Sequence, residues 1–328
     1  MPTRRGPTRA SPALVWTAIL ILYVVWGSTY LGIRIAVESI PPFAMAAVRF
    51  AIAGLVLLAV VYVLRRGSVR RPSLREWRDC FIVGAFLMGG GMGAVAWGEQ
   101  TVPSGITALL IAMMPVWVAV FGRVFLGERL PRAAAIGIAT GMAGVVILVG
   151  PSIAIDRSLD PAGIVALIIS PISWAAGSLF SANRARLPKD PFLTTGMQMV
   201  AGSTVLAAAS LLSGELRSFR VETITPESLI AFAYLTVVGS LVAFTAYAWV
   251  LRHAPLPLIA TYAFVNPIVA VFLGWLILQE DVTPRQVIAG AVIVVGVALI
   301  VAARSRMTSV RPAPAPTRPM PEDEVAAA

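Results

Sequence analysis

The sequence has very little of the two residue types on which many metal and catalytic sites depend. Among 328 residues there is one cysteine, Cys80, and one histidine, His253. A single cysteine excludes an intramolecular disulfide and a cysteine metal cluster. A single histidine leaves no pair of imidazoles for a zinc site of the usual type. We therefore expect neither a metal site nor a cofactor.

Charge is also scarce. Charged residues make up 13% of the chain and hydrophobic residues 58%, whereas a soluble domain carries about twice that charge. The apolar residues form long runs, and a helix needs roughly 20 of them to cross the hydrocarbon core. Runs this long do not alternate as barrel strands do, so helices are expected. The sequence predicts an all-α protein of the lipid bilayer with ten spans, at 13–34, 42–64, 77–97, 103–125, 132–150, 160–182, 190–212, 227–250, 257–279 and 284–303.

The net charge of +10 could suggest a nucleic-acid partner, but the positions of the charges argue against one. Twenty basic residues fall on the side of the N-terminus, five fall on the opposite side, and Arg49 lies within a span. This bias follows the positive-inside rule. It predicts a multi-pass protein of the cell (inner or cytoplasmic) membrane with both termini in the cytoplasm. The first run lacks a small-residue cleavage site, so we expect a retained span rather than a signal peptide.

One segment of the chain is repeated. Pro115 and Glu128 recur as Pro267 and Glu280, 152 residues later, and five predicted spans lie on each side of about residue 151. A duplicated unit with an odd number of crossings enters the membrane from opposite sides. Inverted repeats of this kind underlie alternating access in secondary transporters.

The repeat divides the chain into four segments. The tail from Met307 is rich in proline, alanine and mixed charge without apolar periodicity, which indicates disorder. The expected segments are a cytoplasmic N-terminal segment at 1–12, a first repeat at 13–150, a second repeat at 160–303 and a disordered cytoplasmic tail at 304–328.

Several stretches resemble a known family. WGSTYLGIR from Trp26 and PPFAMAAVRF ending at Phe50 are similar to the start of EamA-family members of the drug/metabolite transporter superfamily. The Pro…Gly-Glu-Arg-Leu pattern ending the fourth span, and NPIVAVFLGWLILQE ending the ninth, resemble that family's repeat hallmark. The resemblance covers roughly 13–303. It implies ten helices in a five-plus-five arrangement and transport of small molecules, commonly efflux of amino acids or other metabolites.

Arg49 is the ionisable residue that lies well inside a span. At 1.5 Å per residue it is roughly 10 Å deep, and an intramembrane charge is by default a functional hypothesis. Two readings stay open. Arg49 contacts substrate, or it has a structural role, reaching the interface or bracing helix ends.

Polar, aromatic and proline residues within spans are the other candidates. Pro115 and Pro267 remove backbone donors, and breaks of this kind tend to line protein-walled cavities. They are predicted gating positions, with a plain kink as the alternative. Aromatic rings could stack on an organic substrate and amides could orient it, although interfacial belts also use Trp and Tyr. The predicted substrate-binding residues are Trp26, Tyr30, Arg49, Trp97, Gln100, Trp117, Trp174, Tyr247, Tyr262 and Asn266.

Small residues predict close helix contacts. The run MGGGMG from Met88 has no strand before it and no Lys-Ser/Thr after it, so it is not a phosphate loop. Glycines in membrane helices usually permit close packing. We expect the fifth and tenth spans to pack against each other through Gly141, Gly144, Gly290 and Gly296, away from the substrate path.

The function predicted is a secondary transporter of small organic metabolites, an exporter of amino acids, related compounds or drugs. An intramembrane enzyme would need a nucleophile-base pair, a carboxylate dyad or metal ligands at mid-depth, and the sequence offers none. The alternative is a membrane scaffold or receptor-like protein. Glu99, Glu128 and Glu280 fall at helix ends, where we expect them to contact loops, caps or basic neighbours in water. No central carboxylate suggests proton coupling, and both a monomer and a homodimer are compatible with the sequence.

Overall fold

The computed structural model describes residues 11–64, 70–128, 131–154, 159–217, 219–250, 253–254, 259 and 261–309. These residues form helices and connecting turns, with no strand among them. Eight helical stretches are long and apolar enough to cross a membrane, and two apolar helices are shorter. The chain is thus an all-α membrane protein with ten transmembrane helices in two inverted repeats of five. Most predicted span boundaries agree with the structure within three residues.

The first repeat begins with a span made of three consecutive pieces. In chain order its elements are α1 (Pro12–Ile21), η1 (Leu22–Trp26), α2 (Gly27–Ala36), α3 (Pro42–Leu64), α4 (Leu74–Gly84), η2 (Ala85–Met92), α5 (Gly93–Gly98), α6 (Ser104–Ile111), α7 (Met114–Leu126) and α8 (Arg132–Ala154).

The second repeat starts with clear sequence signals. Asp160 and Asp190 accept hydrogen bonds from the first backbone N–H groups of two helices, and a proline follows each of them, as is typical of helix starts. Its elements are α9 (Pro161–Asn183), α10 (Pro191–Ser213), the 3₁₀ turn η3 (Val221–Thr223), α11 (Pro226–Tyr234), η4 (Leu235–Val242), α12 (Ala243–Val250), α14 (Tyr262–Leu278) and α15 (Pro284–Ser309).

The predicted disordered tail begins too early. Helix α15 continues through Ser309, six residues past the predicted end of the last span, and residues 310–328 lie outside the described residues. The N-terminal segment at 1–12 lies almost wholly outside them as well.

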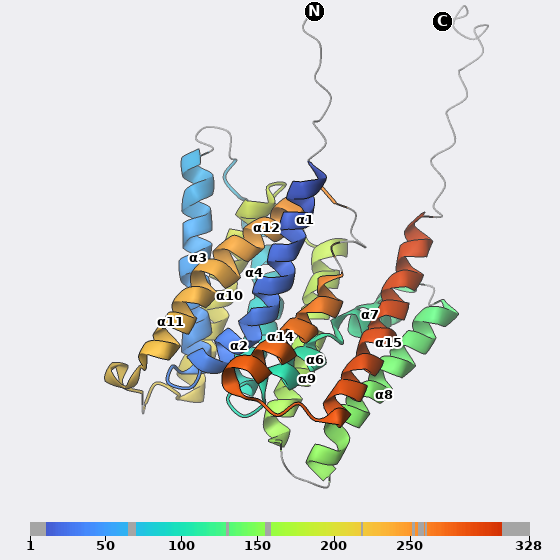
Figure 1. Ribbon diagram of the computed structural model, residues 1–328. Coiled ribbons are helices and arrows are strands. Elements are labelled where there is room, and N and C mark those ends of the chain that lie inside the picture. The colour runs from blue at the N-terminus through green and yellow to red at the C-terminus, as the bar shows by residue number, and fades with distance from the viewer. Residues whose placement is uncertain are drawn as a thin grey trace, which may run out of the picture.

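The first helix begins and the last helix ends on the same side of the molecule (Figure 1). We call this the termini side, and we call the opposite side the distal side. Because each span crosses once, α2, α5 and α14 end on the distal side, and α6 begins there. The charge distribution of the sequence predicts that the termini side is cytoplasmic.

Equivalent spans of the two repeats form the two closest helix pairs. Helix α3 packs along α10, and α8 packs along α15, so α8 and α15 lie side by side at one edge of the molecule (Figure 1). A Cβ on Gly296 would lie 2.5 Å from the backbone nitrogen of Gly141, and one on Gly54 would lie 2.9 Å from the Gly196 carbonyl oxygen. Glycine therefore lets these backbones meet directly.

The predicted packing of the fifth span on the tenth is confirmed, with one correction. Gly141, Gly144 and Gly296 lie at the contact between α8 and α15. A Cβ on Gly290, however, would meet Leu109 of α6 at 3.1 Å. Gly290 is therefore on the side of α15 that faces α6, not on the side that faces α8.

Three spans contain a π-helical stretch, which the sequence did not predict. The stretches are η1 in the first span, η2 in the third and η4 in the eighth, so η2 and η4 occupy equivalent positions in the two repeats. A π turn shifts the register of the side chains that follow it and is frequent at functional sites. In this chain each π stretch contributes a residue to the central cavity described below.

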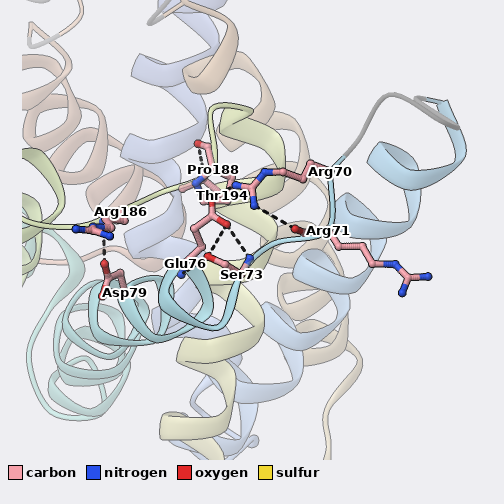
Figure 2. A network of polar contacts seen from close by, with 8 residues as sticks. All are labelled: Arg70, Arg71, Ser73, Glu76, Asp79, Arg186, Pro188 and Thr194. Atoms are coloured by element: carbon pink, nitrogen blue, oxygen red, sulfur yellow. Dashed lines mark hydrogen bonds and ion pairs between the residues drawn. The ribbon is translucent and has the colours of Figure 1, made fainter.

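On the termini side, α4 is tied to the second repeat by a polar network (Figure 2). Ser73 and Glu76 form a capping box at the start of α4, and Arg70 contacts Glu76 at 2.6 Å. One turn on, the Asp79 carboxylate accepts a 2.8 Å hydrogen bond from the backbone nitrogen of Arg186, in the connection between α9 and α10. The hydrogen bond from Arg186 to Asp79 therefore joins the two repeats on the termini side.

Candidate substrate cavity

A cavity of about 110 Å³ lies between the two repeats. Its walls come from the first four spans and from the sixth, eighth and ninth, and none of the described side chains of α8, α10 or α15 lines it. The cavity therefore suits a compact organic molecule, and the pair α8–α15 lies away from it.

Arg49 of α3 brings a positive charge to this cavity. The residue is 2% exposed, and its Nε donates a 2.8 Å hydrogen bond to Oγ of Ser240 in η4. Ser240 itself donates to the carbonyl of Leu235, five residues earlier, at 3.0 Å. The π turn thus places a hydroxyl where Arg49 can reach it.

The guanidinium carbon of Arg49 lies over the ring of Phe50, 4.9 Å from its centroid, but the far end of the group has no polar partner among the described residues. No carboxylate of the described residues forms an ion pair with it, and neither terminal nitrogen donates to a described acceptor. Gly239 makes room beside it, since a Cβ there would lie 3.3 Å from Nη2. The side chain is buried, its hydrogen bond goes to a hydroxyl group, and Arg49 lines the cavity; substrate contact by Arg49 stays a prediction.

Aromatic rings form one wall. Trp26, at the end of η1, packs its ring edge-to-face on Tyr262, with centroids 5.0 Å apart, and against Phe244 at 5.5 Å. All three line the cavity, and Tyr30 and Trp174 line it too. Aromatic side chains give such a site a large apolar surface with fixed geometry.

Asn266 of α14 provides a polar group on the same helix. It is 6% exposed, it lines the cavity, and its Oδ1 is buried without a hydrogen-bond partner among the described residues. It lies one turn after Tyr262 on the same face of α14. A buried amide oxygen without a donor is costly, so this atom is ready to accept a hydrogen bond from a ligand.

The two repeated prolines lie in different local structures. Pro115 is at the start of α7, directly after a turn at Ala112 and Met113 that interrupts the fourth span. Pro267 lies inside α14, which continues unbroken through the equivalent position. Both prolines line the cavity. The two halves, similar in sequence, therefore have different conformations at the cavity.

Four predicted site residues lie outside the cavity. Trp97 and Gln100 line a separate hollow of about 520 Å³ on the distal side, with Glu38 and Glu215. The other two contact neighbouring aromatic rings, with centroids 6.3 Å apart for Trp117 and Phe121 and 5.1 Å apart for Tyr247 and Trp26. From the sequence alone it could not be told which face of each helix meets the cavity.

Sequence reasoning also missed several cavity residues. Gly239, in an apolar run of the eighth span, and Pro171, inside the continuous helix α9, both line the cavity, and Ser240 next to Gly239 binds Arg49. A Gly-Ser pair and an internal proline in otherwise apolar helices were available as signals. The role of the Gly-Ser pair depends on Arg49, which binds Ser240 from about 190 residues away in the sequence.

On the distal side a carboxylate of the second repeat contacts the first repeat. Glu280, just after α14, accepts hydrogen bonds from the backbone nitrogens of Ser104 and Gly105, at 2.8 and 3.2 Å, and from Oγ of Ser104 at 3.0 Å. It caps the start of α6, as an acid at a helix N-terminus does. The expectation that Glu280 contacts a cap is confirmed. The expectation of a watery environment for Glu99 is wrong, since this side chain is 0% exposed.

Comparison with known proteins agrees with this architecture. The model of the EamA-like transporter family matches residues 14–150 and 161–302, one match for each repeat. The chain belongs to the EamA-like transporter family. It is 38% identical over 286 residues to the inner membrane transporter YedA of Escherichia coli strain K12, covering 86% of this chain and 89% of YedA.

More distant relatives match over similar lengths. A WAT1-related chloroplast protein of Arabidopsis thaliana is 26% identical and covers 88% of this chain and 69% of its own. Protein PecM of Dickeya dadantii is 26% identical, and the match covers 84% of this chain and 88% of PecM. A crystal structure of another protein, 22% identical, superposes with a TM-score of 0.61 over 90% of this chain and 99% of that one. This last likeness shows that the ten-helix fold is shared.

Proposed function

We propose that this transporter is a secondary carrier that exports small organic metabolites, such as amino acids, related compounds or drugs. The observation that carries the proposal is the Arg49 guanidinium in a cavity between inverted repeats, with no polar partner among the described residues for its terminal nitrogens. Membership of a transporter family supports transport rather than catalysis or a scaffold role. The relatives named as transporters support it too.

The chemistry of the cavity favours a substrate with an anionic group and a flat apolar part. A carboxylate can accept two parallel hydrogen bonds from the terminal nitrogens of Arg49. The oxygen of Asn266 can accept from an ammonium group, and Trp26, Trp174 and Tyr262 can enclose a ring or chain. An aromatic amino acid combines these three features.

Alternating access accounts for the difference between the repeats. In an inverted-repeat carrier, the two halves exchange conformations when the open side changes. The fourth span is interrupted at Pro115 while α14 is continuous at Pro267. On the distal side Glu280 joins the second repeat to α6 of the first. We propose that these features belong to one of the two states and that Pro115 and Pro267 act at the gates.

The proposed setting is the cytoplasmic membrane, with both termini in the cytoplasm as the basic residues predict. YedA is named as an inner membrane protein, which supports this location. The cavity is formed within one chain, so the proposal holds for a monomer as for a homodimer.

The test is counterflow in proteoliposomes that contain the purified chain, with labelled amino acids and aromatic cations as probes. Saturable exchange by the wild type is expected. Arg49→Gln should weaken the exchange of amino acids and spare that of aromatic cations, and Asn266→Ala should weaken both. The matched control is Arg184→Gln, which removes an exposed arginine after α9. Folded wild-type protein that exchanges no probe would favour the scaffold alternative.

A further inference from the structure

A buried carboxyl lies on the distal side, outside the cavity. Glu99 directly follows α5, is 0% exposed, and neither of its carboxyl oxygens has a hydrogen-bond partner among the described residues. A carboxylate in that position would lack both water and a donor, which is a costly arrangement for an ionised group. Export of a metabolite through the cavity does not by itself give Glu99 a role.

The charged groups around Glu99 do not neutralise it. Arg34, near the end of α2, donates to the main-chain carbonyls of Glu99 and Gln100 rather than to the carboxyl. Glu280 adds a negative charge from the second repeat, and its own oxygens are bound at Ser104 and Gly105. These contacts hold the backbone around Glu99 in place and leave its side chain unpaired.

Two further titratable groups face this region. Asp160, before α9, is bound to Thr101 at 3.0 Å and to the backbone nitrogens that begin α9. Tyr30 of α2 is close enough to interact with the charge of Glu99, and its ring also lines the central cavity. Tyr30 is therefore near the buried carboxyl and also borders the cavity.

The surroundings favour a protonated Glu99 in this conformation. Burial raises the pKa of Glu99 well above its ordinary value, the nearby Glu280 raises it further, and Arg34 only partly opposes both. The contacts that bury Glu99 cross the repeat boundary, because Arg34, Glu99 and Ser104 belong to the first repeat and Glu280 to the second. Opening the distal side would separate these groups and admit water, which favours the ionised form.

We propose that Glu99 is the proton-binding group of this carrier and that export of substrate is coupled to the entry of protons. The inference rests on the proposed function and adds its driving ion. With the distal side open, the hydrated carboxylate takes a proton from the outer solution, forming an O–H bond on one carboxyl oxygen. The neutral carboxyl is then compatible with distal closure. Loss of that proton toward the cavity, past Tyr30, returns the carboxylate and completes the exchange.

The protonation itself can be tested without a substrate. Infrared spectra of the full-length protein in lipid nanodiscs resolve the carbonyl band of a protonated carboxyl. At neutral pH we expect the wild type to show this band and Glu99→Gln to lack it. The control Glu38→Gln, which changes an exposed distal acid, should keep it. Equal spectra for wild type and Glu99→Gln would overturn the inference. If Glu99→Gln fails to fold, Glu99→Asp keeps a carboxyl and should shift the band.

Coupling is tested in proteoliposomes, with a labelled amino acid mixture as the probe. A gradient of one pH unit supports about tenfold accumulation for each proton exchanged. We expect such accumulation by the wild type, and a ratio near one for Glu99→Gln, which should still catalyse counterflow without a gradient. Accumulation by Glu99→Gln equal to wild type would refute the coupling and leave the transport proposal intact. Absence of wild-type counterflow would refute the transport proposal, and the coupling with it, whereas the infrared result would still decide the protonation.

Discussion

Removal of the Glu280 carboxylate should open the distal side of the transporter. In the structure this carboxylate accepts three hydrogen bonds from Ser104 and Gly105, at 2.8, 3.0 and 3.2 Å. Ser104 is 0% exposed, so in Glu280→Ala its donors would lose their acceptor while still buried. The distal-closed state is the only one of the two proposed states in which this contact can form as described.

The size of the expected shift follows from the net free energy that such hydrogen bonds contribute. In the distal-open state, water would solvate both the carboxylate and the start of α6, so the gross strength of the bonds largely cancels. A helix cap contributes about 0.5–2 kcal/mol net, and a hydrogen bond to a charged group about 1.5–3 kcal/mol. We take about 2 kcal/mol for the three hydrogen bonds to Glu280 together. Their loss would shift the equilibrium between the two states about 30-fold.

Thiol labelling measures this shift. Ala108 is 1% exposed and lines the cavity one turn below Ser104, so Ala108→Cys reports opening from the distal side. The native Cys80 is buried in α4. With a membrane-impermeant maleimide added outside, Glu280→Ala should raise the labelling rate of Ala108→Cys about 30-fold. Glu38→Ala, which changes an exposed distal acid, should leave it unchanged. A rate for Glu280→Ala within twofold of the parent would show that Glu280 does not hold the distal side closed.

Three further predictions concern stability. Gly296→Leu should lower the folded yield and the melting temperature in detergent by overpacking α15 against α8, at a cost of about 3 kcal/mol, whereas Gly150→Leu, near which only one side-chain atom of Val146 lies, should be tolerated. Because the pKa of Glu99 is raised in the folded protein, its contribution to stability is complete below the unfolded pKa of about 4.5 and is lost as pH rises through the folded value. The wild type should therefore lose more melting temperature than Glu99→Gln between weakly acidic and weakly alkaline pH, and parallel curves would contradict this. Asp79→Ala should destabilise the protein by about 1–3 kcal/mol by leaving the Arg186 backbone nitrogen without its acceptor (Figure 2), and an unchanged urea midpoint would contradict this.

The helices and their pairing could be read from the sequence because they depend on local and periodic features. Span length follows from the hydrocarbon thickness, and Pro161 and Pro191 after capping aspartates mark two helix starts. The repeat of Pro115 as Pro267 revealed the duplication. The glycines of α8 and α15 predicted a close pair, which the structure contains.

Other features could not be read, because they depend on contacts between distant spans. The burial of Glu99 arises where α2, α5, α6 and the end of α14 meet, and a residue at a helix end is ordinarily in water. The π stretches change side-chain register without leaving a trace in hydropathy. Trp26, at the end of η1, lines the cavity, whereas Tyr247, which follows η4, contacts Trp26 but does not line it. The equivalent sequences around Pro115 and Pro267 also cannot reveal which repeat is interrupted in a given state.

The central claim is that substrate crosses through the cavity between the repeats. The most direct test is counterflow by wild-type protein, Ala263→Ser and Ala263→Trp, because Ala263 lines the cavity and is only half-buried. A tryptophan there would fill much of the space of about 110 Å³. We predict exchange by the wild type and by Ala263→Ser, and none by folded Ala263→Trp. Exchange by Ala263→Trp at the wild-type rate would contradict the claim.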